Sequence, residues 1–206
     1  MTHIFFNSGR EFPLTGSHMF AKGNKLSFEE IAFSLAQINR FTGHCSRPYS
    51  VAEHSLLVAG TALRVFNAPT IVQLAALMHD AHECICGDAS SPVKEMLGDS
   101  WAHFESTHQT AVLMHHNLHI VFEKNRDMIR QCDLIALATE RRDLLPFDPA
   151  IHAPWPILDT PGQTVQPLAI NLNQPVLRDK TWAAWARLFV DHADLLTLRS
   201  IQGTTT

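Results

Sequence analysis

The sequence contains little tyrosine, few glycines and no excess of positive charge. Its 206 residues include 1 Tyr and 9 Gly, and 16 Lys and Arg stand against 20 Asp and Glu, which gives a formal net charge of −4. A chain with this balance is not expected to bind a nucleic-acid polymer or an anionic membrane surface through its overall charge. Charged residues make up 17% and hydrophobic residues 46% of the chain, a composition typical of globular rather than disordered proteins.

The chain also lacks a CxxC pair and any long apolar run. Its four cysteines, which are therefore not expected to form a zinc knuckle or a thioredoxin-type site, are Cys45, Cys84, Cys86 and Cys132. The longest apolar runs, such as Leu74–Met78, have five residues, far fewer than the roughly 18 of a membrane-spanning helix. The N-terminus has no basic region followed by an apolar stretch, so it does not resemble a signal peptide. We therefore expect a cytoplasmic protein with reduced thiols.

Apolar periodicity predicts an all-α protein with a short N-terminal hairpin or irregular arm over residues 1–25. Ser27 and Glu30 have the spacing of a capping box, which opens the first helix. The further predicted helices start at Pro48, run from Pro69–Thr70 to a break at Gly87–Asp88, and cover about Asp99–Asn117 and about Asn125–Leu144. We expect one domain over residues 1–206, with its helical core at about 26–145.

Proline is concentrated near the C-terminus. Seven of the 11 prolines lie between Pro146 and Pro175, which excludes a continuous helix there. The sequence predicts a Pro-rich loop over 146–177 and a closing helix over about 178–198. Long loops of this kind are often functional or form interfaces, so this segment is a candidate contact surface.

Histidine is the residue type in excess, with 13 copies. His54, the adjacent pair His79-Asp80, and Asp133 fall in three segments predicted to be helical. Imidazole nitrogens combined with carboxylate oxygens suit Zn, Fe, Mn, Co or Ni better than Ca. Glu83 follows His79 by four residues, so it is expected to share a helix face with it and could act as a general acid or base beside the metal.

This pattern resembles the HD-domain superfamily of metal-dependent phosphohydrolases, whose fold is a helical bundle. The resemblance extends from about Ser8 to Leu145, and more loosely to the closing helix. It is closest to the branch that contains bacterial 5′-deoxynucleotidases and phage or prophage deoxynucleotide triphosphohydrolases, some of which act on dATP. Besides the four residues above, it rests on Ile38–Phe41, Tyr49–Ser55, Leu77–Glu83, Gly87–Asp88, Pro92–Lys94 and Ala138–Leu144.

The resemblance implies roles for individual residues. One divalent transition metal (Zn, Co, Mn, Fe or Ni) would be held by His54, His79, Asp80 and Asp133. It implies that Glu83 is catalytic, while Mg would enter with the substrate phosphates. No second histidine motif stands at the positions that some members use, so a second histidine-built metal site is not expected. His82 is expected either to flank the pocket or to face solvent, and His44 could line the pocket.

The same resemblance implies a substrate-binding set. It implies that Arg40 holds phosphate oxygens and that Asp88 contacts the sugar hydroxyl, which would favour deoxyribose. Phe41 stands next to that arginine, where better-known nucleotidases have Trp, and could pack against base or sugar. Lys94 and Arg47 could reach the phosphates. The structural alternatives remain open, namely a salt bridge for Arg40, a core position for Phe41, a turn for Asp88 and a surface position for Lys94.

The implied activity is hydrolysis of the 5′ phosphoester of a deoxynucleotide. The substrate would be a dNTP, with dATP as the favoured guess, giving deoxynucleoside and triphosphate, or a dNMP, giving deoxynucleoside and phosphate. One alternative is a cyclic-nucleotide or signalling phosphodiesterase, which would call for more metal-binding histidines. Another is a catalytically silent HD nucleotide-binding module, against which the intact ligand set argues. Relatives form dimers or larger rings, so a homo-oligomer (dimer or hexamer) is expected.

Overall fold

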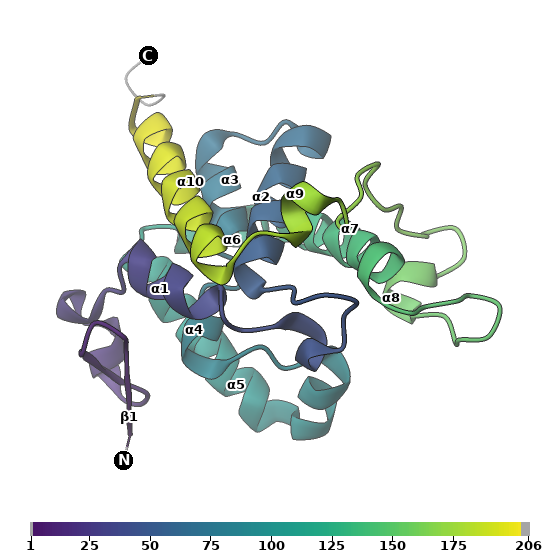
Figure 1. The fold of residues 1–206 in the computed structure, drawn as a ribbon. Coiled ribbons are helices and arrows are strands. Elements are labelled where there is room, and N and C mark those ends of the chain that lie inside the picture. The colour runs from purple at the N-terminus through teal and green to yellow at the C-terminus, as the bar shows by residue number, and fades with distance from the viewer. Residues whose placement is uncertain (1, 203–206) are drawn as a thin grey trace.

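The computed structural model describes residues 2–202, and these residues are mostly helical (Figure 1). This confirms the all-α class. The helices are α1 (Phe28–Leu35), α2 (Val51–Phe66), α3 (Thr70–Leu77), α4 (Glu83–Cys86), α5 (Ser91–His115), α6 (His119–Lys124), α7 (Arg126–Leu144), α8 (Pro156–Asp159), α9 (Pro175–Arg178) and α10 (Trp182–Gln202). No helix among these residues is both long and apolar enough to cross a membrane.

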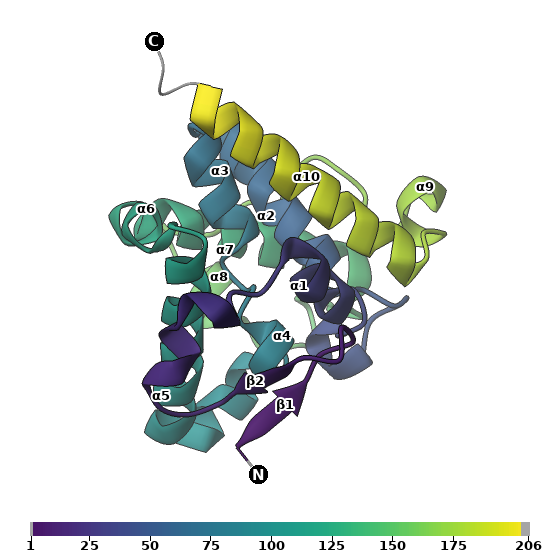
Figure 2. The same ribbon diagram turned by 90° about the vertical axis from the view of Figure 1, so that its left-hand side faces the viewer.

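The N-terminal arm is a hairpin, as predicted. Strands β1 (His3–Phe5) and β2 (Glu11–Pro13) pair antiparallel, with Ile4 opposite Phe12. Phe12 is fully buried, and its ring lies 6.5 Å from the ring of His108 on α5. The hairpin therefore covers part of α5 (Figure 2). Two short 3-10 turns, Ser17–Phe20 and Lys22–Asn24, lead from it to α1.

Side-chain caps fix where the first two long helices begin. The Ser27 hydroxyl accepts a hydrogen bond from the Glu30 amide, and the Glu30 carboxylate accepts one from the Ser27 amide, so the predicted capping box is present. Helix α2 begins at Val51 and not at Pro48, because Ser50 caps it by accepting a hydrogen bond from the amide of Glu53. The predicted helix from Asn125 to Leu144 is confirmed as α7.

The predicted third helix is wrong in its second half. Helix α3 ends at Leu77, residues 78–82 form a turn, and α4 begins at Glu83. His79 and Asp80 thus lie in this turn and not on a helix. The side chain of Gln109 on α5 donates a hydrogen bond to the carbonyl of His79, and this bond from a distant helix contributes to fixing the turn. The α3–α4 turn projects both side chains toward α2.

Helix α5 is broken at Gly98, which has φ 67°. Residues 91–97 form a first helical segment, and the longer second segment begins at Asp99, where the sequence predicts a helix start. A residue with positive φ cannot continue a right-handed helix, and glycine adopts it without a steric penalty. The two segments therefore run in different directions, and the sequence analysis missed the first.

The main hydrophobic core lies around α2. Helices α3, α7 and α10 contact α2, and α10 also runs along α1 and α3 (Figures 1 and 2). This helix begins at Trp182 and ends at Gln202, so it starts and ends four residues later than predicted. The residues of α10 that enter the core are Trp185, Phe189, Ala193 and Leu196.

The Pro-rich segment contains only the short helices α8 and α9, as the prolines predict. It is held on α7 by polar contacts. Arg141 forms two hydrogen bonds with Asp159 at 2.6 and 2.7 Å. Arg142 donates to the carbonyls of Leu168 and Ile170, and the Leu172 amide donates to Asp143. The excursion is therefore an ordered layer beside α7.

Leucine-to-alanine substitutions on the buried and on the exposed face of α10 should differ in their effect on the free energy of unfolding. Leu196→Ala should lower the free energy of unfolding by about 2–5 kcal/mol, because it leaves a cavity in the core. Leu198→Ala on the same helix should change it by less than about 0.5 kcal/mol. Their side chains are 2% and 60% exposed, respectively. Equilibrium urea unfolding followed by circular dichroism measures both, and equal effects would contradict this packing of α10.

Candidate metal centre

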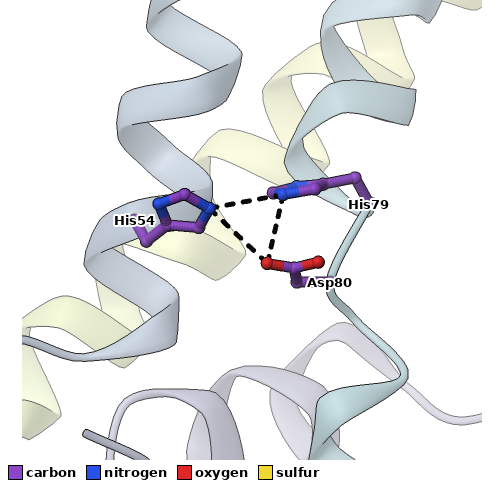
Figure 3. A group of neighbouring side chains, drawn as sticks. All are labelled: His54, His79 and Asp80. Carbon is purple, nitrogen blue, oxygen red and sulfur yellow. Dashed lines mark hydrogen bonds and ion pairs between the residues drawn. The ribbon is translucent and has the colours of Figure 1, made fainter. Parts of the chain in front are cut away.

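Three elements bring four potential metal ligands together. His54 lies on α2, His79 and Asp80 lie in the α3–α4 turn, and Asp133 lies on α7. The Nε2 atoms of His54 and His79 are 3.3 Å apart, and Asp80 Oδ2 is 3.5 Å from the first and 3.1 Å from the second (Figure 3). Asp133 Oδ1 is 3.2 Å from Nε2 of His54. The structure therefore brings His54, His79 and Asp80 into one cluster, and Asp133 contacts this cluster through His54.

Both imidazole rings are oriented by a hydrogen bond at the opposite nitrogen. His54 Nδ1 lies 2.6 Å from Oε1 of Glu140, and His79 Nδ1 lies 2.9 Å from the carbonyl oxygen of Ala76. Such partners fix the ring orientation and tautomer of metal-binding histidines. With a proton on each Nδ1, both Nε2 lone pairs face the same point between the rings.

This cluster fits a divalent cation. Ligand atoms about 2.0–2.2 Å from a zinc-sized cation stand about 3–3.5 Å apart, which matches the separations of 3.1 to 3.5 Å measured here. Two facing lone pairs beside two carboxylates leave only acceptors around the central point, so a positive species is needed there. The described residues thus include a group that could hold a metal ion.

Glu140 contacts the cluster, although no role was expected for it from the sequence. Its carboxylate is fully buried and contacts His54, the hydroxyl of Tyr49 at 2.9 Å, and Arg40 at 3.3 Å. It follows Asp133 by seven residues on α7, which is two helical turns, so both project from the same face. This spacing is the signal that could have identified it.

The charges around the cluster shift the pKa of its members. Burial and the Arg40 cation lower the pKa of His54, but Glu140, Asp133 and Asp80 outweigh them, so this pKa lies well above its ordinary value. Burial raises the pKa of Asp80, yet the neighbouring His79 and His54 hold it well below its ordinary value. The surrounding carboxylates therefore favour the protonated form of His54 in the absence of a metal.

Glu83 stands beside the cluster with little stabilisation of its charge. It is the first residue of α4, its side chain is buried, and Oε2 has no hydrogen-bond partner among the described residues. Burial, followed by the charges of Asp80 and Asp88, raises its pKa well above the ordinary value. Glu83 is thus near the predicted ligands, although its position on α4 and not on one continuous helix with His79 corrects the prediction.

Arg40, predicted to bind substrate, lies beside the cluster. Its guanidinium is 3.7 Å from Oδ2 of Asp80 and 3.3 Å from Oε2 of Glu140, and it stacks 5.5 Å from the ring centre of Phe41. Phe41 and Thr42 both have φ 54°, which is uncommon for bulky and β-branched residues. This strained 3-10 turn, Arg40–Gly43, places the half-buried Phe41 ring next to the arginine.

The other predicted substrate residues differ in their surroundings. Lys94 lies 4.0 Å from Oε1 of Glu83 and 2.6 Å from Oε1 of Glu105. Burial raises the pKa of the half-buried Asp88, although Arg40 opposes this shift. Arg47 is buried and donates to Glu53 and to the carbonyls of Pro48 and Leu172. Arg47 thus joins α2 to the Pro-rich segment, which favours a structural role.

Glu140 gives a test of the metal centre. Glu140→Gln should weaken divalent-metal binding about 10- to 100-fold, because the carboxylate that orients His54 is lost. The matched control is Glu30→Gln, which removes another buried carboxylate, paired with Arg10 at 2.7 Å. The control should lose stability but keep its metal affinity. Competition with a chromophoric chelator measures both, and unchanged affinity in Glu140→Gln would refute the role of this carboxylate.

The raised pKa of His54 predicts proton release on metal binding. Below that pKa the metal-free protein holds a proton on His54, which a cation must displace, so metal affinity should rise with pH by about tenfold per unit. Above the pKa of His54, metal affinity should no longer depend on pH. Calorimetric titration in two buffers of different ionisation enthalpy measures the proton directly. Equal binding heats in both buffers would show that no proton leaves.

Comparison with known proteins places the chain in a family. No protein-family model matches it. It is similar to the uncharacterized protein YfdR of Escherichia coli K12, with 36% identity over 148 residues, which cover 70% of this chain and 76% of YfdR. An uncharacterized protein of Rhodobacter capsulatus is 32% identical over 161 residues, which cover 73% of this chain and 78% of that protein. Neither name states an activity. The shared length and identity establish that this chain belongs to the same family as YfdR.

Proposed function

We propose that this protein is a metal-dependent phosphohydrolase of the HD type that cleaves the 5′ phosphoester of a deoxynucleotide. The observation that carries the proposal is the pair of His54 and His79 Nε2 atoms, 3.3 Å apart, each oriented from its other nitrogen and flanked by Asp80 and Asp133. The residues that resemble the HD superfamily support the same activity.

The ligand set is suited to Zn, Co, Mn, Fe or Ni, since it combines two imidazole nitrogens with two carboxylate oxygens. A divalent cation held there supplies Lewis-acid chemistry, because it lowers the pKa of water and stabilises charge on phosphoryl oxygens. Mg²⁺ would enter with the substrate phosphates, since it is usually held by few protein carboxylates and by phosphates.

Glu83 is the proposed general acid–base. A buried carboxyl with a raised pKa and an Oε2 that has no hydrogen-bond partner among the described residues can hold a proton and pass it on. In the proposed reaction it takes a proton from the attacking water. As the bond between the α-phosphorus and the 5′ oxygen breaks, a proton passes to that oxygen and the deoxynucleoside leaves. The other product is phosphate from a monophosphate or triphosphate from a dNTP.

Arg40 and Lys94 are the proposed phosphate-binding cations. Arg40 lies next to Asp80, so its guanidinium is held at the edge of the metal centre, where it can stabilise charge on the reacting phosphate. Lys94 lies 4.0 Å from Glu83 and supplies a second positive charge nearby. Two cations favour the longer triphosphate, and dATP remains the favoured substrate from the resemblance.

Asp88 and Phe41 complete the proposed substrate set. Asp88 follows α4 and lies close enough to Arg40 and Asp80 to feel their charges, so its carboxylate could accept a hydrogen bond from the sugar hydroxyl. The strained backbone at Phe41 is the kind of outlier that clusters at binding sites. Its ring could pack on the sugar or base next to the Arg40 guanidinium.

The decisive experiment is an assay of the full chain reconstituted with Mn, Co or Zn against every dNMP and dNTP. We expect deoxynucleoside as one product, with phosphate or triphosphate as the other, and pyrophosphate as neither. Turnover of a cyclic nucleotide alone would favour the phosphodiesterase alternative. Binding of nucleotides without any turnover, with all three metals, would favour the silent module and refute the proposed activity.

A single substitution separates catalysis from metal binding. Glu83→Gln should keep the metal but reduce kcat about 10²- to 10⁴-fold, the usual contribution of general acid–base catalysis. Glu95→Gln is the matched control, because Glu95 is an exposed carboxylate in the first segment of α5, and it should act as the unmodified protein does. Metal content is measured by atomic emission alongside the rates. Normal turnover in Glu83→Gln would show that another group moves the proton.

A further inference from the structure

A second group of potential metal ligands lies beside the proposed active site. His82 ends the α3–α4 turn, Cys86 is the last residue of α4, and Glu105 comes from the second segment of α5. One ligand atom from each lies within 4.8 Å of the others. The group shares no residue with the cluster of His54, and the sequence analysis expected no second histidine-built site.

The local structure explains why these three side chains meet. His82 and Cys86 are four residues apart across α4, so they project from one face. The side chain of His82 is buried, with only 4% of it exposed, which corrects the expectation that it could face solvent. Its Nδ1 has no hydrogen-bond partner among the described residues, while Nε2 lies 3.6 Å from Oε1 of Glu105. Nε2 is thus the nitrogen that faces Glu105 and is available to a metal.

Lys94 is the present cation at this group. Its ammonium lies 2.6 Å from Oε1 of Glu105. The two residues are 11 positions apart on α5, a separation of about 16 Å in a straight helix. Only the break at Gly98 lets Lys94 fold back onto Glu105. The positive charge that Glu105 attracts is thus a lysine side chain that is 33% exposed.

We propose that His82, Cys86 and Glu105 form a second metal site, which takes a borderline-soft divalent cation of the zinc class in place of the Lys94 ammonium. A thiolate, an imidazole and a carboxylate are ligands that Zn²⁺ and Co²⁺ accept and that Mg²⁺ and Ca²⁺ do not favour as a set. Thiolate and carboxylate together neutralise the charge of the cation. Three protein ligands leave a coordination position for water.

Occupation of this site changes the partner of Lys94. A cation on Glu105 repels the ammonium, and the other carboxylate next to Lys94 is Glu83, 4.0 Å away. Ligand atoms of a zinc-sized ion that binds a thiolate as well as nitrogen and oxygen stand about 3–4 Å apart. His82 Nε2 and Glu105 Oε1, which are 3.6 Å apart, already have this spacing. The second site itself does not depend on the proposed phosphohydrolase activity.

Cobalt distinguishes the two sites by their ligands. The full-length protein, stripped of metal with a chelator, is titrated anaerobically with Co²⁺ while absorbance and bound cobalt are measured. The first centre has only nitrogen and oxygen ligands, so it adds weak visible bands alone. Burial, with Glu83 and Glu105 nearby, raises the pKa of the Cys86 thiol to about 12, so a thiolate there signals bound metal. We expect two bound equivalents and a near-ultraviolet thiolate-to-cobalt charge-transfer band.

Variants assign that band. Cys86→Ser and His82→Gln should each lose the band and one equivalent of cobalt. Because two different variants are expected to give the same result, misfolding of one of them cannot by itself decide the test. Cys45→Ser is the matched control, another half-buried cysteine outside the group, and it should keep both. His79→Gln should lose the other equivalent and keep the band, which separates this site from the first centre. Absence of the band, or its persistence in Cys86→Ser, would overturn the second site.

Lys94→Met tests the competition between ammonium and cation. Without the lysine, Glu105 has no positive partner, so cobalt should bind the second site about tenfold more tightly, a change of about 1.4 kcal/mol. The near-ultraviolet band reports this affinity directly. An unchanged or weaker affinity would overturn the placement of the cation on Glu105.

Discussion

The candidate metal centre depends on one buried carboxylate. Glu140 is fully buried on α7 and bonds three groups that come from separate parts of the chain, His54, Tyr49 and Arg40. A charge removed from water in this way destabilises the fold unless partners surround it. Burial raises the pKa of Glu140, but Arg40 and His54 lower it further, so the carboxylate stays ionised. Packing α7 against α2 therefore requires these partners to be in place.

The contact between His54 and Glu140 also fixes the orientation of the His54 ring in the cluster. Because Nδ1 is engaged by Glu140, Nε2 must face His79, whose own Nδ1 is engaged by a backbone carbonyl. Two unprotonated Nε2 atoms facing each other repel, so a positive species between the rings is needed to stabilise this arrangement. A proton and a divalent cation compete for that one position. Glu83 lies just outside it, where it has no such partner and keeps a raised pKa.

The sequence predicts features that a few neighbouring residues determine better than features that depend on contacts between distant residues. Ser27 predicts the start of α1 because a capping box is complete within four residues. The end of α3 could not be predicted, since no glycine or proline lies between Thr70 and Cys86. There the side chain of Gln109 and the contacts of His79 override helix propensity. The predicted metal ligands rest on a resemblance to a family, which assigned no role to Glu140, whose contacts with His54, Tyr49 and Arg40 join distant parts of the chain.

The break at Gly98 shows how backbone geometry decides which charges meet. If the helix continued straight through Gly98, Lys94 would lie far from Glu105. Neither Glu105 nor Glu83 would then have an ammonium next to it. With the break, one lysine stands 2.6 Å from Glu105 and 4.0 Å from Glu83. A single ammonium cannot neutralise Glu105, Glu83 and a substrate phosphate at the same time. If another cation binds Glu105, more of the Lys94 charge is therefore available beside Glu83, where the proposed reaction takes place.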